Sequence, residues 1–338
     1  MQRCIKLAEK GLGKTFPNPL VGSVIVYKDK IIGEGWHQKA GSFHAEANAI
    51  SNVQNKEFLS KSTLYVSLEP CNHFGKTPPC SDLIIKNKIP RVVIASTDPN
   101  PLVAGKGIEK LKKAGCEVLV GVLKKEADFL NRRFFTFHNL KRPYIILKWA
   151  QTKNNFIAPI QKKTDNPEIF WITNNYSKQR VHKWRSEEAA ILVGVQTVIN
   201  DNPELTTREW TGNNPLRIVI DPNRRTPKNS KLFQDNIPTL FFTKDPIQLL
   251  PNKKEQKIVS PFSIKNILKE CYKLKIQSII IEGGLRTLEY FIKDNLWDEA
   301  RVFKTEKKIK TGIMAPEFKK ISNQTEIYEG DILDIYFN

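Results

Sequence analysis

One histidine and two cysteines in the first 80 residues constrain this chain more than any other feature. They are His44, Cys71 and Cys80, and imidazole and thiolate groups are preferred ligands of zinc. Three protein ligands leave one position of a tetrahedral zinc ion open for water, whereas a structural zinc site usually closes with four. Glu46 follows two residues after the histidine. A carboxylate there is suited to move protons on a zinc-bound water, whose pKa falls to about 7.

The order of these residues predicts a reaction. A His-x-Glu followed by Pro-Cys and a second Cys is typical of zinc enzymes that hydrolyse an exocyclic amine from a nucleobase or a related ring. The chain contains His44-Ala45-Glu46, then Pro70-Cys71, then Cys80. A lone histidine or cysteine is more often structural, but this ordered combination is much harder to produce by chance. We therefore predict that His44, Cys71 and Cys80 bind zinc and that Glu46 is the catalytic proton shuttle.

Length and composition narrow the class of protein. A chain of 338 residues is longer than one typical domain, so two domains are expected. It has no run of roughly 20 apolar residues and no apolar signal-peptide core, which predicts a cytoplasmic protein that does not enter a membrane. Five cysteines, an odd number, argue against a disulfide framework. The net charge of +19 fits a phosphate-bearing partner, but the lysines are dispersed, so we expect no nucleic-acid partner.

Predicted helices and strands alternate along the chain, which favours two α/β domains, residues 1–143 and 144–338. The boundary is placed at Pro143, because a residue before proline disfavours helix. His44 opens one predicted helix, and Cys80 opens another with Ser81 and Asp82 as capping residues. In the second domain we expect strands over residues 144–150, 169–173, 190–194, 216–220, 239–243 and 278–281.

Two glycines, Gly283 and Gly284, separate the last of these strands from a helix predicted to begin at Leu285. Such a turn lets backbone amides and a helix N-terminus approach a phosphate. Most Gly-Gly pairs are ordinary turns, however. The three spaced glycines of a Rossmann fingerprint are missing here.

The spacing of the cysteines separates the classes of deaminase. Eight residues lie between Cys71 and Cys80, whereas deaminases of nucleic acids and free bases usually have two. The stretch PCNHFGKTPPC (70–80), together with the turn at 17–22, the motif at 44–46 and DPNP at 98–101, resembles the bifunctional riboflavin-biosynthesis deaminase–reductase family over nearly the whole chain. The resemblance implies a cytidine-deaminase-like three-layer α/β/α domain followed by a dihydrofolate-reductase-like α/β domain.

The resemblance also implies an activity. A zinc-dependent hydrolase would deaminate 2,5-diamino-6-(5-phosphoribosylamino)pyrimidin-4-one, and an NADPH-dependent oxidoreductase would then reduce the ribosyl group to ribityl. The expected cofactors are one zinc ion per chain and NADPH, and the expected assembly is a homo-oligomer. By position, the residues implied to bind the deaminase substrate are Asn18, His73, Lys76, Thr77 and Asn100.

The same resemblance assigns residues in the second domain. Those implied to bind NADPH are Ala150, Trp171, Thr197, Asp201, Gly284, Leu285, Arg286 and Thr287. Those implied to bind the reductase substrate are Arg185, Leu205, Arg208 and Glu282. The two arginines suit a phosphate, because a guanidinium presents forked hydrogen-bond donors.

Three positions depart from the family pattern. Thr152-Lys153-Asn154-Asn155 stands where Ser-x-Asp-Gly is usual, Ile169 stands where a polar contact is common, and Asn202 replaces an aspartate. They leave open the alternative of an active deaminase with a weak or non-catalytic C-terminal domain. A measurement of NADPH binding would decide between the two. The positive charge leaves open a nucleic-acid deaminase, which salt-sensitive RNA binding would reveal.

Overall fold

A computed structural model describes residues 1–72, 78–101, 103–160, 170–246 and 254–338. The chain forms two compact units, Met1–Lys141 and Arg142–Asn338, and the division lies two residues before the boundary predicted after Pro143. Within the described ranges, no helix has both the length and the apolar character needed to cross a bilayer.

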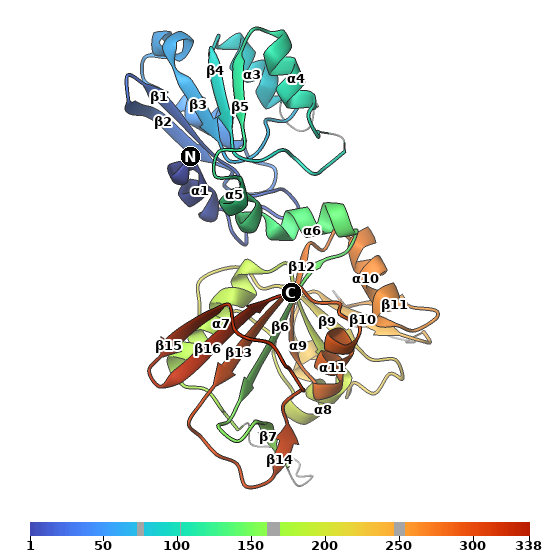
Figure 1. Ribbon diagram of the computed structural model, residues 1–338. Coiled ribbons are helices and arrows are strands. Elements are labelled where there is room, and N and C mark those ends of the chain that lie inside the picture. Colours follow the sequence, from blue (N-terminus) through green and yellow to red (C-terminus); the bar gives the residue numbers. More distant parts are fainter. Residues whose placement is uncertain (73–77, 102, 161–169, 247–253) are drawn as a thin grey trace. The chain divides into compact units, whose positions relative to one another are not determined.

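The first unit is built on a five-stranded sheet of order β2-β1-β3-β4-β5 (Figure 1). Its elements are α1 (Gln2–Glu9), β1 (Gly22–Tyr27), β2 (Lys30–Trp36), α2 (Ala45–Ser51), the 3-10 helix η1 (Lys56–Lys61), β3 (Thr63–Val66), α3 (Cys80–Lys86), β4 (Arg91–Ile94), α4 (Lys106–Lys113), β5 (Glu117–Val120), α5 (Lys124–Leu130) and α6 (Arg132–Leu140). Strand β1 pairs antiparallel with both β2 and β3. Strands β3, β4 and β5 run parallel. Lys28 and Asp29 close the β1–β2 hairpin with φ of 46° and 58°, as a tight type I′ turn requires.

Successive residues of β1 face opposite sides of this sheet, and each side has its own helical layer. Val24 packs with Cys4 and Leu7 of α1. Ile25 packs on the other side, in a cluster to which α2, α3 and α4 contribute. The result is the expected three-layer α/β/α arrangement, with α2 and α3 on the same face of the sheet.

The second unit contains a nine-stranded sheet of order β11-β10-β9-β8-β12-β6-β13-β16-β15. Its elements are β6 (Tyr144–Gln151), β7 (Phe156–Pro159), α7 (Asn175–Glu187), β8 (Ala190–Gly194), α8 (Val195–Asp201), β9 (Leu216–Ile220), α9 (Lys231–Gln234), β10 (Thr239–Thr243), β11 (Lys254–Ile258), α10 (Ile264–Lys273), β12 (Ser278–Gly283), α11 (Leu285–Lys293), β13 (Glu299–Lys304), β14 (Gly312–Met314), β15 (Gln324–Tyr328) and β16 (Asp331–Phe337). In this order, every strand from β11 through to β13 runs parallel to its neighbours. Strands β16 and β15 are added antiparallel at one edge. Strands β7 and β14 form a small separate sheet.

Helices cover both faces of the large sheet (Figure 1). Ile267 of α10 and Phe291 of α11 belong to one core cluster. Val181 of α7 and Leu232 of α9 belong to the other. The central strands β8 and β12 are buried on both faces, which explains their nearly continuous apolar sequences. They lie side by side, so the residues that follow them meet at one edge of the sheet, where ligands bind in open α/β folds.

Two local expectations are wrong. The described part of the predicted strand over 169–173, residues 170–173, is not a strand. Phe170 and Trp171 are exposed there, and the segment instead leads into the N-cap of α7, where the side chain of Asn174 accepts a hydrogen bond from the backbone of Ser177.

Neither Ser81 nor Asp82 caps α3, because the helix begins at Cys80, before both residues. The N-cap is Pro79, which has no side-chain hydrogen bond to offer. Asp82 lies within the first turn and pairs with Lys110 of α4.

Candidate functional site

The three predicted zinc ligands converge although they come from separate segments. His44 is the N-cap of α2, Cys80 is the first residue of α3, and Cys71 lies in the connection between β3 and α3. The Nδ1 atom of His44 is 3.3 Å from Sγ of Cys80 and 3.5 Å from Sγ of Cys71. All three ligand atoms lie within 4.8 Å of one another.

This geometry fits zinc. In a tetrahedral site, bonds of about 2.3 Å to sulfur and 2.0 Å to nitrogen place the nitrogen and sulfur atoms about 3.5 Å apart. Hydrogen bonds from the Cys80 side chain, and then from His44, lower the pKa of Cys71 to about 4, and the backbone N–H of Cys80 also donates to its sulfur. The pocket therefore stabilises Cys71 as the thiolate, the form that binds a metal.

Glu46 lies in the first turn of α2 and is 3% exposed. Burial raises the pKa of its carboxyl group to about 7, and the charge of His44 opposes the shift. A group that both accepts and returns a proton works best with a pKa near the working pH. The environment of Glu46 thus suits the proton-transfer role predicted from its spacing to His44.

Predicted substrate residue Asn18 is held next to the ligand histidine by a residue that the sequence did not single out, His37. Nδ1 of His37 lies 3.1 Å from the carbonyl oxygen of Phe43 and so carries the proton. In the neutral ring Nε2 then accepts, and it is 3.0 Å from the amide nitrogen of Asn18. Burial lowers the pKa of His37, which keeps the ring neutral. Its edge-on contact with His44 depends on tertiary packing, and the only sequence hint was its position seven residues before that ligand.

The loop that carries Asn100 is fastened to the segment that carries Cys71. The backbone N–H of Asn100 donates to Asp98, at 2.7 Å from Oδ1. The backbone N–H of Asp98 in turn donates to Glu69, two residues before Cys71. The remaining predicted substrate residues of this unit, His73, Lys76 and Thr77, lie outside the described residues.

In the second unit, predicted substrate residues Arg185 and Glu282 form a two-pronged ion pair, with nitrogen–oxygen distances of 2.8 and 2.6 Å. Arg185 also donates to the carbonyl oxygen of Thr206. Burial alone would raise the pKa of Glu282, but the charge and hydrogen bonds of Arg185 outweigh it and lower the pKa to about 2. Lys148 of β6 adds a half-buried positive charge beside the pair.

The other two predicted substrate residues of this unit lie differently. Arg208 is exposed, and its backbone N–H donates to Nδ1 of His182. Leu205 has φ of 53° and its side chain is buried in a core cluster. Burial first, and then the charges of Arg185 and Arg208, lower the pKa of His182 to about 4. His182 was missed, although it precedes Arg185 by one helical turn and so shares its face of α7.

The predicted cofactor residues Thr197, Gly284 and Thr287 meet where β8 and β12 end. A Cβ atom on Gly194 would lie 2.5 Å from Oγ1 of Thr287, and one on Gly283 would lie 3.2 Å from Oγ1 of Thr197. The two strand-to-helix turns therefore pack closely only because both carry glycine. Backbone N–H groups and hydroxyls gathered at such turns suit the phosphates of a dinucleotide.

The remaining predicted cofactor residues surround these turns. Leu285 and Arg286 open α11, Asp201 ends α8, and Ala150 lies near the end of β6. The carbonyl oxygen of Trp171 accepts a hydrogen bond from Lys307 at 2.7 Å.

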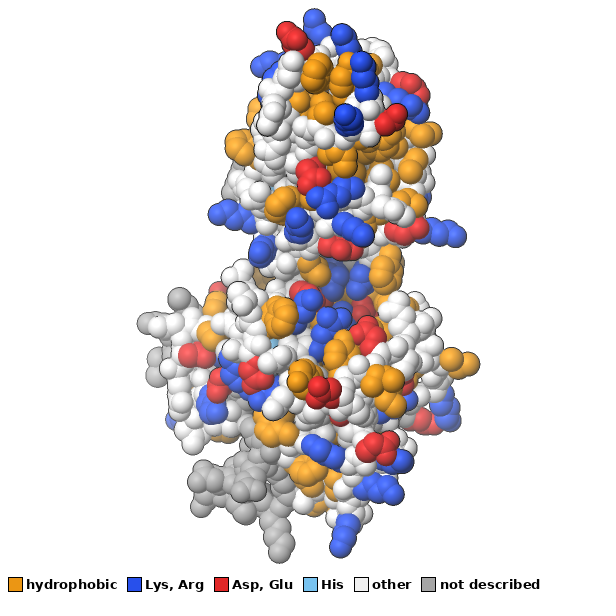
Figure 2. Space-filling view, turned by 90° about the vertical axis from the view of Figure 1, so that its left-hand side faces the viewer, with side chains coloured by type: hydrophobic (Ala, Val, Ile, Leu, Met, Phe, Trp, Pro, Cys, Tyr) orange, Lys and Arg blue, Asp and Glu red, His pale blue; other side chains and the backbone are white. Residues whose placement is uncertain are grey.

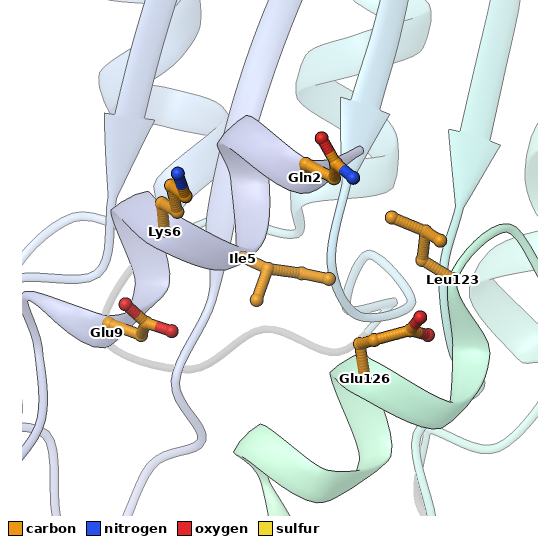
Figure 3. Close-up of a pocket in the computed structure, with 6 residues that line it drawn as sticks. All are labelled: Gln2, Ile5, Lys6, Glu9, Leu123 and Glu126. Atoms are coloured by element: carbon orange, nitrogen blue, oxygen red, sulfur yellow. The ribbon is translucent and has the colours of Figure 1, made fainter.

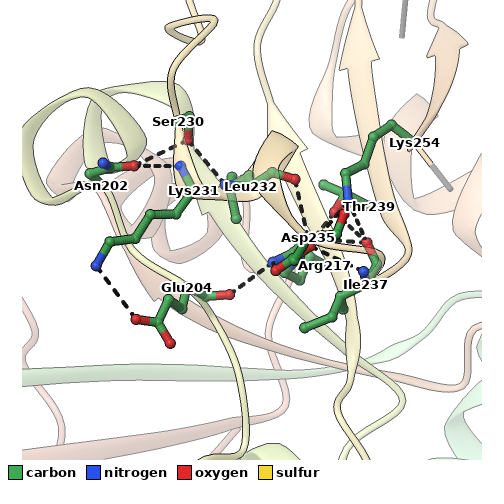
Figure 4. Close-up of polar contacts among 10 residues, drawn as sticks. All are labelled: Asn202, Glu204, Arg217, Ser230, Lys231, Leu232, Asp235, Ile237, Thr239 and Lys254. Carbon is green, nitrogen blue, oxygen red and sulfur yellow. Dashed lines mark hydrogen bonds and ion pairs between the residues drawn. The ribbon is translucent and has the colours of Figure 1, made fainter. Parts of the chain in front are cut away.

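A polar network fastens the loop that carries Leu205 and Arg208 (Figure 4). Asn202, which stands in place of an aspartate, accepts hydrogen bonds from the backbone of Lys231 and the hydroxyl of Ser230. Fully buried Arg217 donates to the carbonyl oxygen of Glu204, and it forms two hydrogen bonds with Asp235 at 2.8 and 2.6 Å. An exposed ion pair between Lys231 and Glu204 adds to the network. An amide at position 202 therefore still supplies the acceptor that this loop needs.

Two surface features lie apart from these sites. A hollow of about 280 Å³ lies between α1 and α5. Figure 3 shows the side chains that line it. It lies on the face of the sheet opposite α2 and α3, away from the zinc ligands. In Figure 2, lysines and arginines are mixed with acidic and apolar side chains over the visible face, which is unlike a continuous nucleic-acid footprint.

Comparisons with known proteins agree with this geometry. The cytidine and deoxycytidylate deaminase zinc-binding region matches residues 1–96, and the RibD C-terminal domain matches residues 143–305. Riboflavin biosynthesis protein RibD of Aquifex aeolicus is 45% identical over 90% of this chain and 85% of that protein. The RibD of Actinobacillus pleuropneumoniae is 43% identical over 84% of this chain and 77% of its own length.

Solved structures give the same result. The crystal structure of a diaminohydroxyphosphoribosylaminopyrimidine deaminase/5-amino-6-(5-phosphoribosylamino)uracil reductase from Thermotoga maritima is similar with a TM-score of 0.89 and 35% identity, over 99% of this chain and 96% of that one. Acinetobacter baumannii RibD is similar with a TM-score of 0.89 and 32% identity, over 99% of this chain and 97% of that one. The chain therefore belongs to the RibD family of riboflavin-biosynthesis proteins, with a zinc-dependent deaminase unit followed by a reductase unit.

Proposed function

We propose that the first unit deaminates 2,5-diamino-6-(5-phosphoribosylamino)pyrimidin-4-one and that the second reduces the ribosyl group of the product to ribityl. The observation that carries the proposal is the convergence of His44, Cys71 and Cys80 beside the buried carboxyl group of Glu46. The choice of substrate is supported by similarity over 99% of the chain to the Thermotoga maritima protein, which is named for these two reactions.

Zinc and NADPH are the cofactors of the family. We assign zinc to Nδ1 of His44 and the sulfurs of Cys71 and Cys80. Zinc, when bound, acts as a Lewis acid toward the attacking water. Glu46 takes a proton from that water and passes protons to the ring nitrogen and then to the departing ammonia. The high pKa that burial gives Glu46 favours both halves of this transfer.

Asn18 and Asn100 are assigned to the pyrimidine and ribose side of the substrate. Because the amide nitrogen of Asn18 is engaged by His37, its oxygen is assigned to accept a hydrogen bond from a donor on the substrate. His73, Lys76 and Thr77 are assigned to the ribose phosphate. Lysine, hydroxyl and backbone donors suit phosphate oxygens.

In the second unit, NADPH, when bound, would supply a hydride for C1′ of the sugar. The binding site for its phosphates is assigned to the turns at Gly194 and Gly283, with the hydroxyls of Thr197 and Thr287. Ala150, Trp171, Asp201 and the first turn of α11 are assigned to the rest of the cofactor.

The substrate of this unit is assigned to Arg185, Leu205, Arg208 and Glu282. Arg208 is exposed and so is accessible to a phosphate. The charge of Glu282, which Arg185 keeps ionised, is suited to hold a sugar hydroxyl.

The test follows both reactions on zinc-loaded protein given the phosphoribosylated diaminopyrimidine, with and without NADPH. We expect ammonia release followed by loss of NADPH absorbance. Ammonia without NADPH oxidation would reject the reductase and leave a silent second unit. Failure of zinc-replete protein to release ammonia would reject the substrate and make nucleic acid the next candidate.

We also propose a cytoplasmic homo-oligomer. All five cysteines are free thiols, and a disulfide between Cys71 and Cys80 would remove two zinc ligands, so a reducing compartment suits the site. Strand β5 forms an edge of its sheet, and Leu119 and Val120 on it are exposed, which suits contact with another copy. Cell fractionation and light scattering on purified protein test the two statements, and a monomer would reject the second.

A further inference from the structure

Glu69 is a buried carboxylate that joins two parts of the deaminase unit and has no part in the chemistry described above. It is 4% exposed and directly precedes Pro70-Cys71. Its Oε2 accepts hydrogen bonds from the backbone N–H groups of Asp98 at 3.2 Å and Gly105 at 3.0 Å. Its Oε1 accepts from those of Gly107 at 3.0 Å and Ile108 at 3.3 Å. One side chain therefore satisfies four backbone donors.

These four donors bracket the segment that carries Asn100. Asp98 stands before it, and Gly105 stands after it. Within the bracket, the backbone N–H of Asn100 donates to the carboxylate of Asp98, and the carbonyl oxygen of Asn100 accepts from the backbone N–H of Val103 at 2.8 Å. A continuous chain of hydrogen bonds thus leads from the residue beside the ligand segment to a predicted substrate residue.

The approach of α4 to the ligand segment is equally specific. A Cβ atom on Gly107 would lie 2.0 Å from the carbonyl oxygen of Pro70 and 3.3 Å from Oε1 of Glu69. Only glycine lets the first turn of α4 come this close. The backbone N–H of Glu69 also donates to the carbonyl oxygen of Ser96 at 2.9 Å, which holds the carboxylate at the end of β4.

We propose that Glu69 is a positioning residue for deamination, which sets the place of Asn100 relative to the ligand Cys71. The side chain must be a carboxylate, because each of its two oxygens accepts two N–H groups. Glutamine would turn an NH2 group toward two of these donors. Aspartate is one methylene shorter and cannot span the same four groups.

The inference rests on the proposed deaminase activity, and its test separates the two. Zinc content, kcat and KM for ammonia release are measured for Glu69→Gln and for the wild type. We expect zinc to be retained, because none of the four donors is a ligand, and kcat/KM per bound zinc to fall about tenfold to a hundredfold, mainly through KM. The matched control is Asn55→Ala, which removes the N-cap of η1 elsewhere in the unit and should lower Tm without changing KM.

A second variant tests the same inference if Glu69→Gln does not fold. Asp98→Ala removes the acceptor for the N–H of Asn100 while leaving the bonds of Glu69 intact, and it should raise KM in the same direction. Substrate Kd is also measured by calorimetry in a Glu46→Gln background, where no turnover occurs. A Glu69→Gln or Asp98→Ala variant with normal KM and Kd and only a lower Tm would overturn the inference. A parent protein that neither binds nor deaminates the substrate would reject the proposed substrate instead. In that case amide hydrogen exchange tests whether Glu69 holds the Asn100 segment: exchange over residues 103–108 should be faster in Glu69→Gln, and unchanged exchange would overturn the inference.

Discussion

The guanidinium of Arg185 and the carboxylate of Glu282 bind each other through two hydrogen bonds, across 97 positions of the chain. Both side chains are nearly buried, with exposed fractions of 12% and 6%. Each was assigned to the substrate, and in the structure the two groups satisfy one another. A ligand entering the site therefore meets groups whose charges and positions are already established.

This pair predicts how the stability of the protein depends on pH. The pKa of Glu282 is lowered to about 2 in the folded protein, against about 4.3 in an unfolded chain. A depressed carboxyl pKa contributes stability that is fully present above the unfolded value and is lost as pH falls from about 4.3 toward 2. Glu282→Gln leaves the buried Arg185 unpaired and should destabilise the second unit by about 3 kcal/mol at pH 7. Urea unfolding at pH 7 and pH 3 should show the difference between variant and wild type shrinking at the lower pH, and a constant difference would contradict the assignment.

Glu46→Gln should retain zinc and lose deamination. An amide at this position keeps the size of the side chain but cannot accept a proton from water. We expect kcat for ammonia release to fall by about 10²- to 10⁴-fold, the usual contribution of general acid–base catalysis. Metal analysis confirms that the site is loaded, and NADPH oxidation with the deaminated intermediate serves as the control for the second unit. A zinc-replete variant with full ammonia release would remove Glu46 from the mechanism.

Asn154→Asp should weaken the protein although it restores the usual residue of the family. The amide nitrogen of Asn154 donates to the carbonyl oxygen of Ile309 at 2.7 Å, and its oxygen accepts from the hydroxyl of Thr152 at 2.9 Å. A carboxylate cannot donate to that carbonyl group, so we expect a loss of about 1–3 kcal/mol. Thermal unfolding of Asn154→Asp, compared with Lys153→Ala in an exposed ion pair of the same turn, measures this loss. Equal stability of Asn154→Asp and wild type would show that the bond to Ile309 contributes nothing.

Gly194→Ala should impair NADPH binding and spare the deaminase. The added Cβ atom would lie 2.5 Å from Oγ1 of Thr287 and would force the two strand-to-helix turns apart. We expect the Kd for NADPH, measured by fluorescence titration, to rise about tenfold or more, as overpacking costs about 1–3 kcal/mol. Ammonia release from the same preparation is the internal control. Unchanged NADPH affinity would place the cofactor's phosphates elsewhere.

The zinc site could be predicted from the sequence because its ligands and its catalytic carboxylate belong to short motifs. His44 and Cys80 each stand at a helix start, Cys71 lies in the connection before α3, and their order is informative without any knowledge of packing. His37 and Glu69 were not found, because their partners are brought together only by tertiary structure. Neither residue has a spacing that distinguishes it in the sequence.

The fold shows a similar division. The central strands β6, β8 and β12 were predicted. Helix α8 (Val195–Asp201) was not predicted, because valine, threonine and isoleucine in its sequence favour a strand. The segment that contains Phe170 and Trp171 was predicted as a strand, although both side chains are exposed in the structure.

The strand order of the second unit bears on the timing of synthesis. Strand β12 lies between β8 and β6 in the sheet, yet it is the latest of the three to leave the ribosome. Strand β6 therefore has no completed neighbour until residues 278–283 have been made, and its second neighbour, β13, is later still. The first unit can close its own sheet once β5 has emerged, because domains generally fold as units during translation. A nascent chain thus has a finished deaminase half long before the reductase half can form, and a chain that stops early loses the second activity first.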